Sequence, residues 1–158
     1  MNHRQFLSFS TYLVFETKIC FMKKITLSTA VILFCSLVLM GQKDYKVVFD
    51  LTSADSLSQQ TAIRWAGEVA KADPSAQVEV VMFGKGTALA VKDKSAVADG
   101  VANLATNKNV AFKICAIAMQ NQKIDKSQLL PGIQIVPDGI YEIISKQREG
   151  WGYIKVAH

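Results

Sequence analysis

The sequence predicts an α/β protein built on a five-stranded, mainly parallel sheet with helices on both faces. Short apolar segments of strand length alternate with helical patterns along residues 46–156, an order typical of parallel strands joined by right-handed crossovers. In addition, the first two of these segments, 46–51 and 78–83, contain adjacent rather than alternating apolar residues. Strands of that kind are usually buried on both faces of a sheet.

Two strands and two helices are expected in the first half of this region. Residues 52–55 follow the first strand and offer helix-capping side chains, and the helix after them is stopped by Asp73 and Pro74. The second strand ends at residues 84–86, Gly-Lys-Gly, which are expected to form a tight turn. A further helix then presents apolar residues on one side: Val97, Val101 and Leu104.

The third expected strand ends at Cys115. Val110, Phe112 and Ile114 alternate with Ala111 and Lys113, which is the period of a strand. The residues from 116 to 119 then favour a helical turn. The sequence therefore predicts that the Cys115 thiol lies where a strand passes into a helix.

The last part of the chain completes the alternating pattern. A short helical turn is expected over residues 125–130, and a fourth strand over 133–136. Asp138 is expected to cap the helix that follows, and the final strand spans 151–156. The isoleucines of that helix are expected to face inward: Ile140, Ile143 and Ile144.

The residues before this region have the layout of an export signal. Lys23 and Lys24 precede a mostly apolar run over 25–40 and a small residue, Gly41, which is typical of a secretory signal peptide. The run is shorter than the roughly 20 residues of a spanning helix, so no stable membrane span is expected. The expected organisation is a start-site extension over 1–21, a signal peptide over 22–41, and one domain over 42–158. The location is then the periplasm or the exterior of a bacterium.

Charge and cysteine content limit the function further. The chain has 18 Lys and Arg and 13 Asp and Glu, and the loss of residues 1–41 lowers the net charge from +5 to +2. No basic cluster remains that would neutralise several phosphates together, so nucleic-acid binding is not expected. Cys20 and Cys35 are lost in the same step, which leaves Cys115 without a disulfide partner.

Ligands of open parallel sheets bind outside the carboxyl ends of the strands, which limits the candidate site residues. Those positions hold Asp50 and Thr52, the segment 84–86, Cys115 and Asp138. Cys115 is the strong nucleophile among them, and N–H groups at a helix start favour its thiolate. The alternative is a structural cysteine buried at the end of a core strand.

Supporting groups are expected on either side of the thiol. Gly84, Lys85 and Gly86 have two interpretations: backbone N–H groups and a charge that bind an anion, or a turn with an exposed lysine. Ala116 supplies a helix-start N–H, and Met119 either borders the site or fills the core. Because His3 and His158 lie near the ends of the chain, neither a Cys-His pair nor a metal site is expected. No cofactor is expected.

Several segments together resemble the DsrE/DsrF-like family of sulfur-transfer proteins, which includes the TusD-type relay subunits. They are residues 109–115, Met119, 129–131, 136–139 and 146–154. The resemblance implies a three-layer α/β/α fold with a five-stranded sheet and assembly into homotrimers or homohexamers. It also implies that Cys115 holds a persulfide.

Two functions follow as hypotheses. The first is an exported sulfur carrier, or sulfurtransferase-like protein, that exchanges sulfur with donor and acceptor proteins or small sulfur species through Cys115. The second is a non-catalytic binding or scaffold domain for a small anion or a protein partner. Known relay subunits act in the cytoplasm, so an export signal would separate this chain from their pathways.

Overall fold

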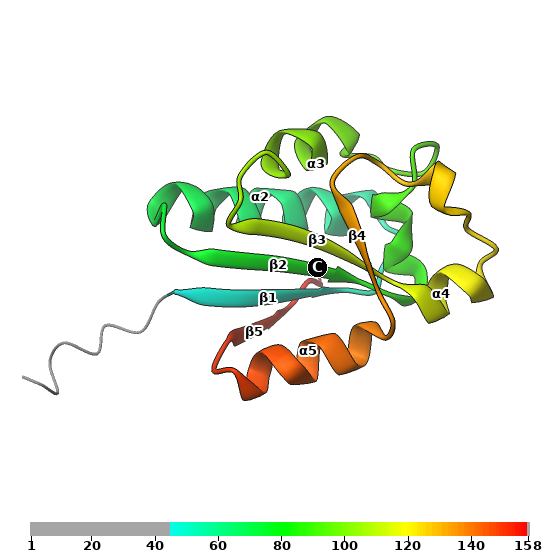
Figure 1. The fold of residues 1–158 in the computed structure, drawn as a ribbon. Helices are drawn as coiled ribbons and strands as arrows, with labels where there is room; N and C mark the ends of the chain where they lie inside the picture. The colour runs from blue at the N-terminus through cyan, green and yellow to red at the C-terminus, as the bar shows by residue number, and fades with distance from the viewer. Residues whose placement is uncertain (1–44, 158) are drawn as a thin grey trace, which may run out of the picture. The chain divides into compact units, whose positions relative to one another are not determined.

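The computed structural model describes residues 45–157, which contain a five-stranded sheet whose strands are all parallel. The strand order is β4-β3-β2-β1-β5 (Figure 1). The strands are β1 (Lys46–Leu51), β2 (Gln77–Met82), β3 (Val110–Cys115), β4 (Ile133–Val136) and β5 (Gly152–Lys155). All five predicted strands are therefore present, with ends that differ by one residue at β2 and β5. The predicted signal peptide and start-site extension lie outside the described residues.

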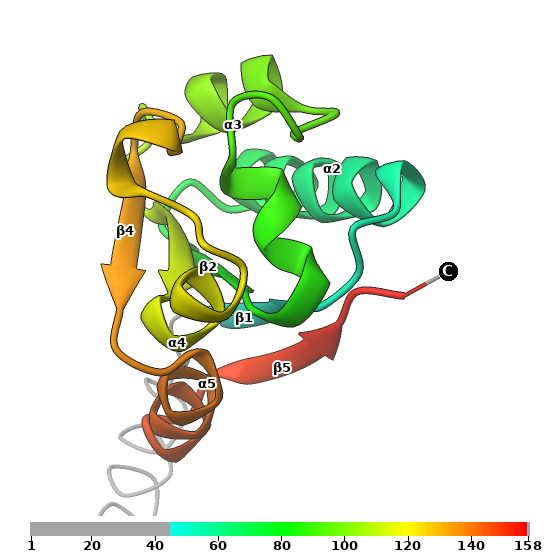
Figure 2. The ribbon, with the colours of Figure 1, turned by 90° about the vertical axis from the view of Figure 1, so that its right-hand side faces the viewer.

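Helices cover both faces of the sheet, which confirms the three-layer α/β/α prediction. They are α2 (Ser56–Ala72), α3 (Ala98–Leu104), α4 (Ala116–Asn121) and α5 (Gly139–Arg148), with 3₁₀ helices η1 (Gly84–Ala90) and η2 (Lys126–Gln128). Helices α2 and α3 lie on one face and α5 on the other, while α4 lies beyond the carboxyl end of β3 (Figures 1 and 2). Among residues 45–157, no helix has the length and apolar content needed to cross a bilayer.

Capping side chains define where the two longest helices begin. The Asp55 carboxylate accepts a hydrogen bond from the Ser58 N–H at 2.8 Å, and α2 ends just before Asp73 and Pro74. The Asp138 carboxylate accepts a bond from the Ile140 N–H at 2.8 Å, as predicted. The start of α5 is thus fixed within three residues of the end of β4.

The two faces of the sheet differ in chemistry. The face under α2 and α3 is a continuous apolar core that includes Phe49, Met82 and Phe112. The face under α5 has a small apolar group of Val48, Val81 and Ile143, with Phe83 and Trp151 packed against it. Charged side chains share this second face, and the third strand places Cys115 on it as well.

One sequence prediction was wrong on the side of this second face. Ile140 and Ile144 do not face inward, because they are 56% and 41% exposed and only Ile143 is buried. With 3.6 residues per turn, the face of α5 that meets the sheet contains Gly139, Ile143 and Lys146, and the other two isoleucines lie to one side. Residues 84–86 lead from β2 into η1, and Lys85 is exposed, in line with the interpretation of this segment as a turn with an exposed lysine.

Gly86 is required by a close approach of two backbone segments. A Cβ atom at this position would lie 2.1 Å from the carbonyl oxygen of Leu51, and backbone on both sides cannot yield. We expect Gly86→Ala to lower the free energy of unfolding by about 2 kcal/mol or more. Gly67→Ala is the matched control, because a Cβ at that helix position meets only Leu104 at 3.8 Å. The control should stabilise by about 0.5–1 kcal/mol, and urea unfolding measures both.

Candidate functional site

Cys115 is the last residue of β3, and it packs against the start of α5. It occupies the N-cap position of α4, and its side chain makes no capping hydrogen bond to that helix. Gly139 packs directly against it, because a Cβ at Gly139 would lie 3.1 Å from the Cys115 Cβ and 3.3 Å from the Phe83 Cβ. Glycine at this position therefore allows α5 to approach the thiol, and Cys115 is only 5% exposed.

A pocket of about 280 Å³ opens beside Cys115 at the carboxyl edge of the sheet. It lies where the sequence predicted a site, because the ends of β2, β3 and β4 meet there. The lining residues are Phe83, Gly84, Cys115, Ile117, Ala118, Asn121, Gln122, Asp138 and Ile140. Cys115 thus combines burial on most sides with one open side.

Gln122 ties the wall of this pocket to the segment after β2. Its Nε2 donates to the Gly84 carbonyl at 2.5 Å, and its Oε1 lies 3.0 Å from the Thr87 hydroxyl. The same hydroxyl lies 3.1 Å from the Gly84 carbonyl, so its single proton serves one of two acceptors at a time. Gln122 was not predicted as a site residue, because its partners lie 35 or more positions away in the sequence.

The other predicted site residues fall at different distances from the pocket. Gly84 lines it, whereas Lys85 is exposed and is not among the lining residues. The Gly86 N–H is already engaged, because it donates to the Phe83 carbonyl at 3.0 Å. Ala116 begins α4, and Met119 is buried in the core on the α2 face.

A second polar group lies at the same edge of the sheet, on β1 and β5. The buried Asp50 carboxylate accepts from the Tyr153 hydroxyl at 2.7 Å and from Lys155 Nζ at 3.1 Å. Lys155 Nζ also lies 2.8 Å from the Thr52 hydroxyl and 5.7 Å from the centre of the Phe83 ring. Asp50 therefore pairs with a cation, whereas Asp138 caps α5.

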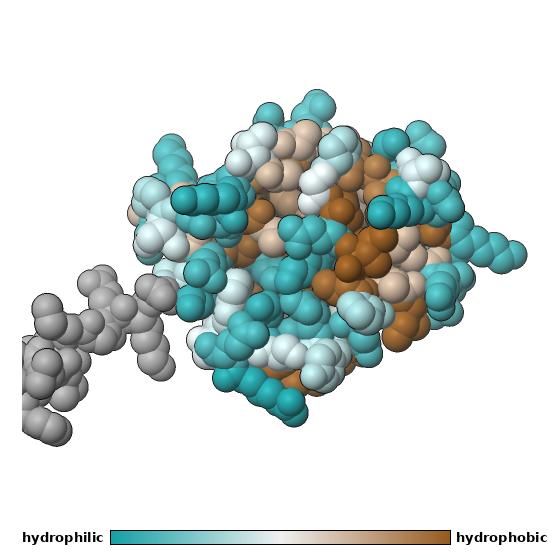
Figure 3. All heavy atoms as spheres, in the orientation of Figure 1, coloured by the Kyte–Doolittle hydropathy of each residue, from teal (hydrophilic) through white to brown (hydrophobic). Residues whose placement is uncertain are grey.

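Hydrophobic side chains are exposed around the pocket. Ile117 and Ile140 line it and are exposed, and hydrophobic surface also gathers over β4 and near the beginning of α5 (Figure 3). Among residues 45–157, no three His, Cys, Asp or Glu side chains are grouped so that they would hold a metal ion. The chemistry of the described site is therefore that of a thiol in a largely apolar pocket.

The model of the DsrE/DsrF-like family matches residues 46–156. The chain belongs to the DsrE/DsrF-like family. Its fold is similar to that of a protein of unknown function from Methanobacterium thermoautotrophicum, MTH1491, with 28% identity and a TM-score of 0.66 over 71% of this chain and 99% of that one. The ychN protein of E. coli shares the fold at 13% identity and a TM-score of 0.60, over 72% and 99%. No curated protein matches the chain.

Family membership confirms the resemblance read from the sequence. The family is associated with sulfur relay in general, and sulfur-relay partners follow in the same general sense.

The contact between Gln122 and Gly84 should control access to the thiol. We expect Gln122→Ala to free the η1 segment and to raise the alkylation rate of Cys115 in the folded protein by about fivefold, the factor for one lost hydrogen bond of about 1 kcal/mol. Gln120→Ala, two residues away on the exposed surface of α4, should leave the rate unchanged. Mass spectrometry of the peptide that contains Cys115 measures both, and equal rates in the two variants would contradict the assignment.

The Tyr153 phenol should ionise at a higher pH than an ordinary tyrosine. Burial, followed by the hydrogen bond to Asp50, raises the pKa of Tyr153 to about 12 from an ordinary 10.0. We expect the absorbance titration of wild type minus that of Tyr153→Phe to show ionisation near pH 12. In Asp50→Asn the pKa of Tyr153 should move back toward 10, because the neutral amide does not repel the phenolate. An unchanged midpoint would show that Asp50 has no part in the shift.

Proposed function

We propose that the protein carries sulfur on Cys115, as a persulfide, between a donor and an acceptor. The observation that carries the proposal is that Cys115, the free cysteine of the described residues, lines a pocket at the carboxyl edge of a parallel sheet. The general association of the DsrE/DsrF-like family with sulfur relay supports it.

The chemistry requires a single thiol at the site. The Cys115 thiolate attacks the outer sulfur of a donor persulfide, a new S–S bond forms, and the donor leaves as a thiolate. An acceptor thiolate then attacks the outer sulfur on Cys115 and releases the Cys115 thiolate. Each step exchanges one S–S bond for another, so no external oxidant or reductant takes part.

The pocket suits such an exchange in two ways. Its apolar lining residues, including Phe83 and Ala118, would lie against the persulfide, and its volume of about 280 Å³ would admit the end of a donor or acceptor. Burial of Cys115 elsewhere leaves this pocket as the side from which sulfur would arrive. Exposed Ile117 and Ile140 at the pocket would contact the incoming partner.

Assembly and export complete the proposal. A homotrimer or homohexamer is supported by the large hydrophobic side chains that α5 exposes, Ile140, Tyr141 and Ile144. Export to the periplasm or the exterior depends on residues 22–41, and it stays a prediction from the sequence.

One observation favours a second function, that of a non-catalytic binding or scaffold domain. Cys115 is only 5% exposed, which is ordinary for a cysteine that fills a core. Under this second function the pocket holds a partner, and Cys115→Ser retains both partner binding and the fold.

Sulfur loading separates the two functions. After the full chain is incubated with polysulfide under native conditions, we expect the tryptic peptide 114–123 to gain the mass of one sulfur atom, and dithiothreitol to remove it. Cys115→Ser is the matched control and should gain nothing on that peptide.

If the folded wild type gained no sulfur on this peptide while the chain unfolded in urea did, the thiol would be sealed. That result would leave the binding or scaffold function.

A further inference from the structure

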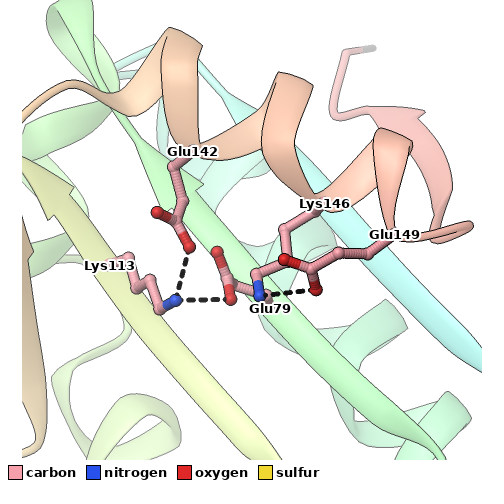
Figure 4. A network of polar contacts seen from close by, with 5 residues as sticks. All are labelled: Glu79, Lys113, Glu142, Lys146 and Glu149. Carbon is pink, nitrogen blue, oxygen red and sulfur yellow. Dashed lines mark hydrogen bonds and ion pairs between the residues drawn. The ribbon is translucent and has the colours of Figure 1, made fainter.

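Three charged side chains lie between the sheet and α5, next to the Cys115 site but not part of its pocket. Glu79 on β2 is 2% exposed. Lys113 on β3 contacts the Glu79 Oε2 at 2.8 Å and donates to the Glu142 Oε1 on α5 at 2.6 Å (Figure 4). We call these residues the Glu79–Lys113–Glu142 triad.

The triad has one positive and two potentially negative groups. If both carboxyls were ionised, the triad would hold a net charge of −1. The Glu79 side chain is 3% exposed, against 16% for Lys113 and 19% for Glu142, so the cost of an uncompensated charge falls mainly on Glu79. The Oε1 atom of Glu79 also has no hydrogen-bond partner in the described structure. Figure 4 shows the Glu79 and Glu142 carboxyl groups pointing toward one another.

We propose that Glu79 and Glu142 share one proton above Lys113, and that this proton keeps α5 packed over Cys115. A single proton makes the triad neutral, because one carboxylate then balances the lysine. It also converts the repulsion between two carboxylates into a hydrogen bond, and it gives the orphan Oε1 of Glu79 a role.

The two carboxyl groups respond in opposite directions, as expected when one proton serves a pair. Burial raises the pKa of Glu79, and the Glu142 carboxylate raises it further, against the effect of Lys113. For Glu142, burial alone would raise the pKa, but the hydrogen bond and the charge of Lys113, together with Glu79 and Lys146, lower it. The shared proton therefore resides on Glu79.

The neighbouring charges leave this arrangement in place. Helix α5 also contributes Lys146, which attracts the Glu142 carboxylate but contacts Glu149 at 3.1 Å and lies 5.0 Å from the centre of the Trp151 ring. On β1 the residue paired with Glu79 is Val48, and on β3 it is Ala111, so both lateral neighbours are apolar. Asp50 of β1 is level with Lys113 in the sheet, with Val81 of β2 between them, and it pairs with Lys155 of β5.

Helix α5 connects the triad to the thiol. Gly139 packs on Cys115, and Glu142 follows three residues later, so the two contacts occupy the same turn of α5. Loss of the shared proton at high pH puts a negative charge under that turn and loosens it. Access to Cys115 then increases with pH. A regulatory role for this change rests on the proposed sulfur transfer, whereas the test of the shared proton does not depend on sulfur transfer.

The sign of the pH effect follows from the direction of each shift. A carboxyl with a raised pKa binds its proton more tightly in the folded state, so Glu79 stabilises α5 below its ordinary value of 4.5 and this stabilisation is lost as pH rises through its folded pKa. The lowered pKa of Glu142 has the opposite effect: it stabilises the folded state above 4.5, and this stabilisation is lost as pH falls through its folded pKa. Above pH 4.5 the change in stability with pH therefore comes from Glu79.

The test compares the full-length wild type with Glu79→Gln, whose amide reproduces the protonated carboxyl but cannot lose a proton. We expect an infrared band of a protonated carboxylic acid in wild type that titrates above pH 4.5, and its absence in E79Q. After correction for intrinsic exchange, amide exchange in α5 relative to α2 should rise about fivefold or more from about pH 5 to pH 8 in wild type. It should stay level in E79Q.

Controls make each outcome decisive. Glu68→Gln, on the exposed surface of α2, should behave as wild type, and E142Q should lose the acid band because Glu79 then pairs with Lys113 alone. E142Q also serves if E79Q does not fold.

A wild type without the acid band, a band that persists in E79Q, or equal exchange slopes in wild type and E79Q would overturn the proposal. Sulfur loading of Cys115 is measured separately, so either proposal can fail alone.

Discussion

The packing of helix α5 on the carboxyl half of the sheet is the constraint on which the Cys115 site depends. Gly139 at the start of α5 approaches Cys115 so closely that a Cβ would meet it at 3.1 Å, while Asp138 fixes where the helix begins. The thiol is thereby covered on the α5 side and open toward the pocket beside α4.

The face of the sheet under α5 is partly polar, in contrast to the face under α2 and α3. The opposite face has a continuous apolar core under α2 and α3, whose burial supplies most of the stability. Under α5 the packing depends on a few apolar contacts and on charges that balance one another. Such an interface responds to protonation far more than an apolar core does, and the Cys115 pocket lies on this side of the sheet.

Much of the fold was predictable because it depends on local patterns. Each of these patterns depends on residues that are close together in the sequence: the runs of buried strand residues, the cap at Asp138, and the stop at Asp73 and Pro74. The same is true of Cys115, whose place at a strand-to-helix junction follows from the period change around it. The inward orientation expected of Ile140 failed, since helix phase depends on which side meets the sheet.

The polar contacts of the site were not predictable in this way. Lys113 and Glu142 are 29 positions apart, and Lys155 and Asp50 are 105 apart, so only the strand order brings them together. The isolated charge of Lys113 within an apolar strand was a signal that a partner exists, but it did not say which one. Likewise Lys85, predicted beside the thiol, is carried to the surface because η1 begins at Gly84.

Transfer of sulfur from loaded Cys115 to an acceptor thiol is the most direct test of the account. Protein loaded with persulfide is mixed with excess small-molecule thiol, and the loss of sulfur from peptide 114–123 is followed in the folded chain and in the same chain unfolded in urea. The account predicts that the folded protein takes up sulfur and passes it on at least as fast as the unfolded chain. Loading and transfer only after unfolding would show that Cys115 is a structural residue of the core.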